Sequence, residues 1–256
     1  MYAGSIRVVA GDRLDTIVEV RPRDPEKDLD VRAADQTEIA HAGGVLTVTT
    51  PRAKSARTWR HRLDTMGPLH LKPSHGLSTV DRAEGAAEII SSTGTVRVGL
   101  FDGPAVLKKS NGVTTVGTVT GDLRLSGANG GIGIARAEAP VTGTTTNGYL
   151  RIAEVARCEV QLQTSNGSVE VGIRESTVAW LDISYNHGKV RNTLAASQAP
   201  EQTADTVKIR ARTNWGNIDV LPRPARNDRA VLDGIALRIP TGVTAEMRPE
   251  RATGRS

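Results

Sequence analysis

Two acidic residues, Glu84 and Asp102, lie 18 positions apart, and Glu138 falls two further intervals of 18 along the chain. If the chain winds so that residues 18 apart become neighbours, these carboxylates line one edge, about 5 Å apart on adjacent strands. Carboxylates at such a separation can serve as acid and base in glycoside cleavage, or can hold a cation. Thr120 interrupts the column, and acidic residues are also common at turns for conformational reasons. We therefore expect a structural role, with a carbohydrate-binding or carbohydrate-cleaving protein as the alternative.

A second group of residues that could bind a ligand is the basic stretch 52–62, where seven of the eleven residues are Arg, Lys, His or Trp. Basic residues around an aromatic ring are typical of contacts with nucleic acid or another anion. The residues that we expect to contact an anion or a partner here are Arg57, Trp59, Arg60 and Arg62. No nucleic-acid-binding motif accompanies them, and the net charge of +5 is small. A solvated loop is the favoured interpretation, and nucleic acid is not an expected partner.

Metal-ligating and nucleophilic residues are few. The five histidines show no spacing typical of a metal site, and the single cysteine, Cys158, has no evident base beside it. We expect no catalytic residue, no cofactor and no metal, and therefore a protein that is not an enzyme. A lone cysteine fits a reducing compartment, and residues 1–10 lack the basic and apolar regions of a signal peptide. Since no apolar stretch approaches the length of a membrane-spanning helix, we expect no membrane span and a cytoplasmic location.

The element that must position all these residues is a short sequence repeat. Residue pairs that end in glycine recur at intervals of 18 and finally 19, and their first members are His75, Thr93, Asn111, Asn129, Asn147 and Asn166. Glycine and asparagine both tolerate the left-handed backbone conformation that a tight corner needs. We predict that these six residues stack as a structural turn ladder at one corner of a coiled chain.

The apolar residues follow the same interval. Five positions after each turn residue stand Val80, Val98, Val116, Ile134 and Ile152, and a second apolar column lies nine positions further on. Within each nine-residue half, apolar and polar residues alternate as in a short strand. An antiparallel meander is the alternative, because Asn-Gly is also a hairpin signal, but it does not explain why every second turn is alike. The pattern predicts an all-β fold, a parallel β-solenoid (β-helix) of about 18 residues per coil in two nine-residue halves, wound right-handed.

The repeat divides the chain into four predicted segments. Residues 1–51 contain strand-like runs at 5–9, 16–20 and 45–49 and a charged, turn-prone segment at 23–30, and they should start or cap the solenoid. Residues 52–65 form a basic irregular connection. Residues 66–221 hold the solenoid repeats, with a loop extruded at 195–205. Residues 222–256 form a basic C-terminal tail with one candidate strand at 230–239.

Several segments of the repeat region resemble a known family. The segments are TIVEVRP at 16–22, FDGPAV at 101–106, VTGDLR at 119–124, NGYLRIAEV at 147–155, VGIRE at 171–175 and RARTN at 210–214. They resemble a bacterial domain-of-unknown-function family described as candidate adhesins with β-strand repeats, and the resemblance spans residues 4–221. It implies a stacked β fold and surface display, and it implies no catalytic or cofactor residues. Members usually have further coils ahead of the segment seen here at 63–65, so the packing of the first segment is expected to differ.

The tail carries a separate and shorter resemblance. Residues 230–242 are similar to the opening strand of ABC-transporter ATPases, which precedes their phosphate loop. That loop would need glycine where Pro249 stands and lysine where Arg255 stands. We expect a terminal strand and no nucleotide site, and a link to such an ATPase is a third hypothesis for a partner.

The repeat as a whole predicts a non-enzymatic scaffold or interaction protein. Stacked coils present long parallel faces to a partner, and the open ends of such a stack can add further strands. A protein partner or self-association is therefore the expected mode of binding.

Overall fold

The computed structural model describes residues 3–9, 17–22, 24–42, 45–49, 58–65, 68–73, 75–175, 177–194 and 206–223. The chain divides into two compact units, Met1–Pro224 and Ala225–Ser256, and every described residue belongs to the first. The loop predicted at 195–205 and the strand predicted at 230–239 lie outside the described residues.

The described elements are one helix and a long series of strands. In chain order they are β1 (Ala3–Val9), β2 (Ile17–Pro22), α1 (Asp28–Asp35), β3 (Glu38–Ala42), β4 (Val45–Thr49), β5 (Thr58–Thr65), β6 (Leu69–Lys72), β7 (His75–Ala83), β8 (Ala87–Phe101), β9 (Ala105–Asn111), β10 (Thr114–Val119), β11 (Leu123–Asn129), β12 (Ile132–Ala137), β13 (Val141–Asn147), β14 (Leu150–Val155), β15 (Glu159–Asn166), β16 (Val169–Arg174), β17 (Val178–His187), β18 (Val190–Asn192), β19 (Thr206–Trp215) and β20 (Ile218–Arg223).

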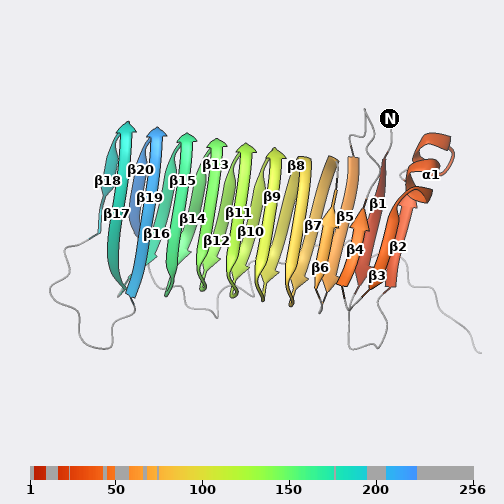
Figure 1. The fold of residues 1–256 in the computed structure, drawn as a ribbon, viewed down its shortest axis with the longest axis horizontal. Coiled ribbons are helices and arrows are strands. Elements are labelled where there is room, and N and C mark those ends of the chain that lie inside the picture. Colours follow the sequence, from red (N-terminus) through yellow and green to blue (C-terminus); the bar gives the residue numbers. More distant parts are fainter. Residues whose placement is uncertain are drawn as a thin grey trace, which may run out of the picture. The chain divides into compact units, whose positions relative to one another are not determined.

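Hydrogen bonding joins these strands into two ladders, seen as a front and a back row in Figure 1. The first runs β3-β4-β6-β8-β9-β11-β13-β15-β19-β17. The second runs β2-β1-β5-β7-β8-β10-β12-β14-β16-β20-β18. Within the described strands, only the β1–β2 and β3–β4 pairings are antiparallel. The predicted all-β class and parallel, solenoid-like stacking are confirmed, and the antiparallel meander is excluded.

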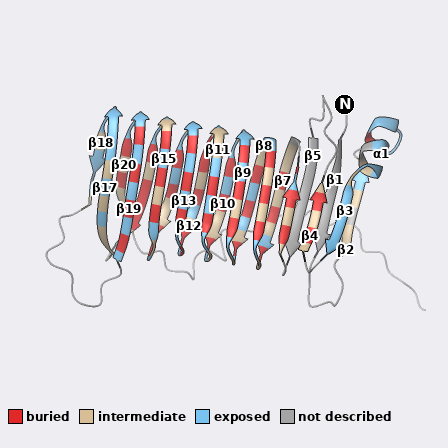
Figure 2. Cartoon of the chain, in the orientation of Figure 1, coloured by how far each residue is buried: buried red, intermediate tan, exposed pale blue. Residues whose placement is uncertain are grey.

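The apolar columns explain why the two ladders face each other. Val116 lies opposite Val98 on one side and Ile134 on the other, and Ile134 lies opposite Ile152, so positions one repeat apart are neighbours. All four side chains are buried. In the other ladder, Leu107 and its partners form the facing column. Figure 2 shows buried and exposed positions alternating along the strands, as expected when one face of each strand packs inward.

Glycine holds the corner between the two ladders in each coil. The corner residues Gly112 and Gly130 have φ values of 111° and 133°, a region that side chains disfavour. A Cβ atom on Gly130 would overlap the carbonyl oxygen of Gly112, one coil away. The regular recurrence of glycine at this corner is therefore required both by backbone conformation and by the close approach of adjacent coils.

The described part of the N-terminal segment starts the stack, and it contains a helix that the sequence analysis missed. The segment predicted as a turn at 23–30 is a turn only at its start, where the Lys27 amide donates to the Asp24 carbonyl. Helix α1 begins at Asp28, and its contacts are with β1 and β2. The acidic residues in its first turn stabilise the helix through their interaction with the positive end of the helix dipole. Ala34 packs against the core. A helix this short and this charged gives too little periodicity to be recognised in the sequence.

The prediction of an irregular connection at 52–65 is wrong for residues 58–65. Residues 58–65 form β5, which pairs in parallel with β1 on one side and β7 on the other. A strand bonded on both sides has its backbone groups satisfied, so it does not need clean apolar alternation to form. The first segment is therefore in line with the coils: β1 and β4 continue the two ladders through β5 and β6.

The last coils do not stack in chain order. Sequential winding would place β17 next to β15, but β19 lies between them, and β20 likewise lies between β16 and β18. β16 and β20 pair over six residues, whereas β18 has only three. The coil with two full-length strands takes the inner place, and the coil with the short strand becomes the end.

Candidate functional site

The predicted turn ladder is an array of hydrogen-bonded amides. The Nδ2 of Asn129 donates to the Oδ1 of Asn111 at 3.0 Å, Asn147 donates to Asn129 at 2.9 Å, and Asn166 donates to Asn147 at 2.9 Å. Thr93 lies opposite Asn111, and His75 lies opposite Thr93, so both extend the column through their backbone register. The amides of the asparagines satisfy one another along the column.

At the C-terminal end of the stack, aromatic residues replace asparagine in the corner column. Asn166 lies opposite Trp215, because one extra residue precedes the glycine in the turn at Asn214–Trp215. The imidazole of His187 stacks on the indole of Trp215 with ring centroids 3.9 Å apart and planes 4° apart. The displaced amides form their own bond, from Asn186 to Asn214 at 3.0 Å. The insertion in both turns was visible in the sequence, but the aromatic stack was not predicted.

The residues of the acidic column contact neighbouring side chains. Glu84 forms an ion pair with Arg82 at 2.6 Å, and Asp102 accepts a hydrogen bond from Thr120 at 2.8 Å. Glu138 pairs with Arg136 at 3.2 Å. Each of these carboxylates thus contacts a side chain of the same edge.

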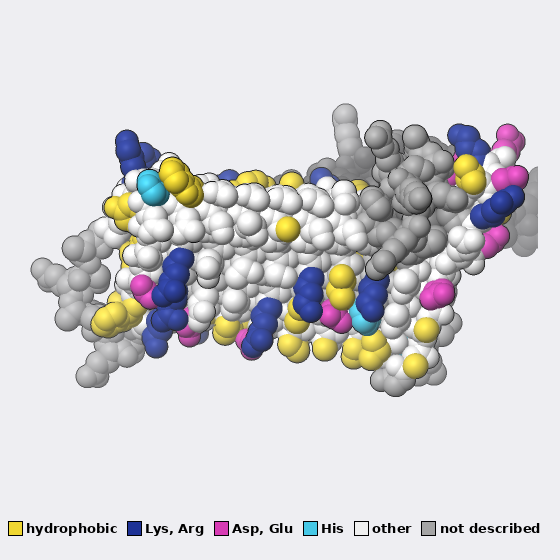
Figure 3. Space-filling view, turned by 45° about the horizontal axis from the view of Figure 1, so that its top comes forward, with side chains coloured by type: hydrophobic (Ala, Val, Ile, Leu, Met, Phe, Trp, Pro, Cys, Tyr) yellow, Lys and Arg dark blue, Asp and Glu magenta, His cyan; other side chains and the backbone are white. Residues whose placement is uncertain are grey.

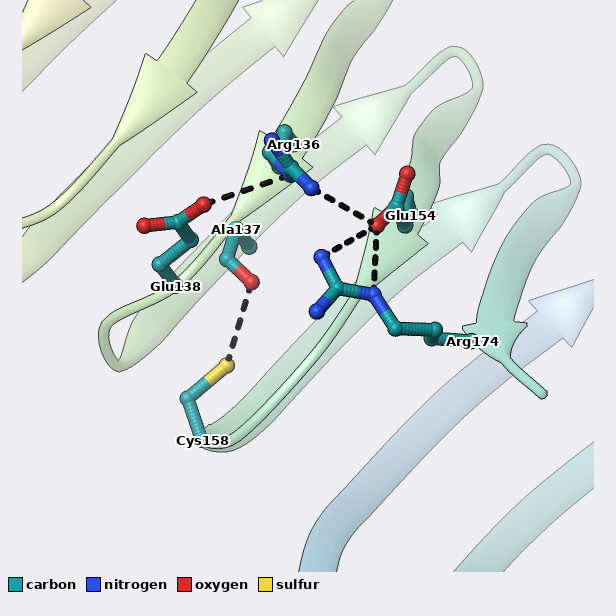
Figure 4. A network of polar contacts seen from close by, with 6 residues as sticks. All are labelled: Arg136, Ala137, Glu138, Glu154, Cys158 and Arg174. Carbon is teal, nitrogen blue, oxygen red and sulfur yellow. Dashed lines mark hydrogen bonds and ion pairs between the residues drawn. The ribbon is translucent and has the colours of Figure 1, made fainter. Parts of the chain in front are cut away.

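Figure 4 shows a polar network next to this edge, centred on Glu154. One carboxylate oxygen of Glu154 accepts from Arg174 Nε and Nη2 at 2.8 and 2.6 Å and lies 3.4 Å from Arg136. Beside it, the Cys158 thiol donates to the Ala137 carbonyl at a sulfur–oxygen distance of 3.8 Å. Burial raises the pKa of Cys158 to about 11. The thiol is therefore protonated at neutral pH and is a poor nucleophile.

A buried lysine was not anticipated from the sequence. Lys109 is only 8% exposed, and its ammonium donates to the Val113 carbonyl at 2.5 Å. Burial lowers its pKa to about 8. Gly127, opposite Lys109 in the next coil, leaves a space of about 10 Å³, and the hydroxyl of Thr145 beyond it has no hydrogen-bond partner. A lysine beside a glycine one repeat later is the signal that could have revealed this arrangement.

The outer face of the first ladder carries a shallow polar depression. It measures about 160 Å³ and is lined by strands β13, β15 and β19, with side chains that include Thr142, Thr144, Gln161, Gln163, Arg210 and Arg212. Figure 3 shows basic side chains at intervals across the strands, several of them beside an acidic one. One such pair joins Arg210 to Asp182 at 2.9 Å. The polar side chains that line the depression are suited to a polar ligand.

The terminal coil exposes apolar side chains. Leu181 lies opposite Ile209, which is 1% exposed, yet Leu181 itself is half-buried. Ala179 and Ile183, on the same face of β17, are half-buried too, and Tyr185 on that face is exposed. On the outer face of the same strand, Trp180 is 70% exposed. These residues lack a covering coil within the described residues, and sequence reasoning missed them because it assumed stacking in chain order.

The residues predicted to contact an anion or a partner belong to the basic stretch 52–62. Arg57 lies outside the described residues. Trp59, Arg60 and Arg62 lie in β5, where the backbone is described but the side chains are not. In the described part of the chain, no cluster of His, Cys, Asp and Glu could hold a metal ion. Among the described residues, no helix is both long enough and apolar enough to cross a membrane.

The fold and surface thus define a parallel β-solenoid-like protein. Comparison with protein-family models, with curated proteins and with solved structures gives no match to this chain.

Proposed function

We propose that this protein is a non-enzymatic β-solenoid scaffold that binds other proteins, in the first place further copies of itself. The observation that carries the proposal is the terminal coil. Among the described strands, β17 and β18 pair with β19 and β20 on one side only, and the inward residues of β17 remain half-exposed. Unpaired strand edges next to apolar surface favour the addition of strands from another chain.

The chemistry of the polar sites supports a role without catalysis. The carboxylates Glu84, Asp102 and Glu138 are engaged by neighbouring side chains, and the Cys158 thiol is protonated. The half-buried thiol agrees with a reducing compartment, so a cytoplasmic location is part of the proposal. The adhesin-like resemblance agrees with an interaction role, whereas the ATPase link depends on residues 230–242 and gains no support.

The proposal includes a right-handed coil whose length equals the interval of the sequence repeat. The register of 18 between β10 and β12 and between β11 and β13 supports the coil size in the centre of the stack. The handedness follows from the strong preference of parallel strand crossovers for right-handed connections.

Light scattering after size exclusion, over a wide range of protein concentration, tests this function. We expect a species of at least twice the chain mass of 27.2 kDa. A strict monomer at every concentration would contradict self-association.

Carbohydrate binding is the second candidate, favoured by the depression over β13, β15 and β19. Threonine and glutamine side chains in rows about 4.8 Å apart offer donors and acceptors to the hydroxyls of a linear glycan. A glycan array with the wild-type protein and with Gln161→Ala tests this candidate. Absence of signal for the wild-type protein, or equal signal for the variant, would argue against it.

A further inference from the structure

The open edge of β17 has a pattern that is complementary to itself. Its inward residues are Ala179, Leu181, Ile183 and Tyr185, and the three of them that are half-buried, Ala179, Leu181 and Ile183, are spaced symmetrically about Leu181. A two-fold axis perpendicular to the sheet keeps the inward face inward and makes two copies of the strand antiparallel. From this geometry we infer that two copies of the protein join end to end through β17, with Leu181 facing Leu181 of the second copy. This inference rests on the proposed function and specifies its partner and its surface.

The outward residues select the same register. Pairing centred on Leu181 places Trp180 opposite Asp182 of the second copy, so the indole N–H faces a carboxylate. A shift of one residue, centred on Asp182, would place two carboxylates directly opposite each other, each of them with Arg210 of its own chain as its ion-pair partner. Like charges in directly opposed positions are destabilising. The Leu181-centred register places the three half-buried residues opposite one another, and it pairs the more exposed Tyr185 with Thr177 of the second copy.

The length of the strand favours a second copy of β17 over the opposite end of the stack. β17 has ten residues, whereas the outer strands at the other end, β2 and β3, have six and five. β3 is exposed along its whole length and supplies no half-buried column to match that of β17. Helix α1 packs beside β1 and β2. Pairing of β17 with β17 of a second copy therefore joins two strands of equal length and equal burial. This pairing produces a closed dimer instead of an open filament.

The first test uses charge. In Trp180→Asp, each new carboxylate faces Asp182 of the second copy, so we expect the mass to fall from about twice 27.2 kDa to that of one chain. Trp180→Asp combined with Asp182→Asn removes the repulsion and should restore the dimer. Tyr149→Asp is the matched control, because Tyr149 is an exposed aromatic residue next to β14, a strand of the other ladder that does not pair with β17. Circular dichroism and melting temperature confirm that each variant is folded.

The second test reads the register directly. With Cys158 replaced by alanine, Leu181→Cys should form an oxidised, covalently linked dimer, because Cβ atoms of directly opposed residues lie about 5 Å apart. Ser184→Cys is the control, since Ser184 faces Val178 of the second copy and its two sulfurs are about 20 Å apart at ~3.3 Å per residue.

The outcomes separate the inference from the function on which it rests. A dimer that survives Trp180→Asp, a double variant that stays monomeric, or equal cross-linking of both cysteine variants would overturn the β17 interface and leave self-association standing. A ladder of growing masses would overturn the two-fold arrangement in favour of head-to-tail growth. A wild-type protein that is strictly monomeric would contradict both.

Discussion

The central coils and the terminal coil contain the same kinds of residue in the same columns, and they differ in what covers them. In the coil of β11 and β12, Ile134 has Val116 on one side and Ile152 on the other and is buried. In the terminal coil, Ile183 has Ala211 as its one strand neighbour among the described residues and remains half-exposed. A coil of this fold is completed by its neighbours, so a stack that ends without a cap keeps a surface with the chemistry of a core.

The largest expected difference between the two regions comes from the corner glycines. Gly130→Ala forces a Cβ atom into the Gly112 carbonyl at a φ of 133°, and we expect a loss of about 3 kcal/mol or more in unfolding free energy. Gly188→Ala meets the same overlap with Gly216, but it can be relieved by release of the terminal coil alone. Urea unfolding and limited proteolysis distinguish the two outcomes, and equal loss of global stability would break the comparison.

The inward columns should show the next largest difference. Ile134→Ala leaves a cavity between two coils and should cost about 3 kcal/mol, whereas Ile183→Ala at the half-exposed position should cost about 1 kcal/mol. Denaturant midpoints at constant slope measure both. If the two substitutions cost the same in the monomer, the terminal coil is covered by something that the described residues do not include.

Lys109 and Tyr185 lie in one inward column, in which each residue is the strand neighbour of the next. Between them, from the centre of the stack to the terminal coil, the column contains Gly127, Thr145, Thr164 and Thr213. Lys109 is buried and its pKa is lowered to about 8, so the unfolded chain binds the proton more tightly. The unfolding free energy should therefore rise as pH increases from about 8 toward 10.5, by about 1 to 2 kcal/mol.

Lys109→Met should abolish that rise and be more stable than the wild type below pH 8. The difference between the two proteins cancels the opposite contribution of Cys158, whose raised pKa makes stability fall between about pH 9 and 11. Parallel pH profiles for the two proteins would show that the Lys109 ammonium is fully solvated.

The smallest expected difference lies in the turn ladder. Asn129→Ala removes a hydrogen bond to each neighbouring asparagine and should cost about 1 kcal/mol. Asn186→Ala removes the single bond to Asn214 at the terminal coil and should cost less. Thermal melting of both variants measures the effect, and an unchanged melting temperature for Asn129→Ala would mean that the exposed amides exchange freely with water.

The sequence was most informative where a position repeats. Columns such as Val98, Val116 and Ile134 follow from the constant interval of 18, because one interval decides every neighbour at once. The insertion of β19 between β15 and β17 could not be predicted, because the residues of β17 and β19 both satisfy the inward pattern and only the competition for full-length pairing decides the order.

The same reasoning explains what was missed in the candidate sites. The carboxylates Glu84 and Asp102 were found by their spacing, but their partners Arg82 and Thr120 decide that they are engaged. Trp180 became a candidate only once its strand was known to lie at the end of the ladder. Spacing predicts which residues become neighbours, whereas exposure depends on which coil is last.

The order of the last three coils is the central claim, and spin labels test it most directly. In a Cys158→Ala background, one labelled pair is Gln163 with Arg212 and the other is Gln163 with Ser184. Gln163 lies opposite Arg212, about 5 Å away between strands, and Arg212 lies opposite Ser184, about 10 Å from Gln163. Stronger dipolar broadening for the Gln163–Arg212 pair is the predicted result. Stronger broadening for the Gln163–Ser184 pair would place β17 beside β15 and contradict the open terminal coil.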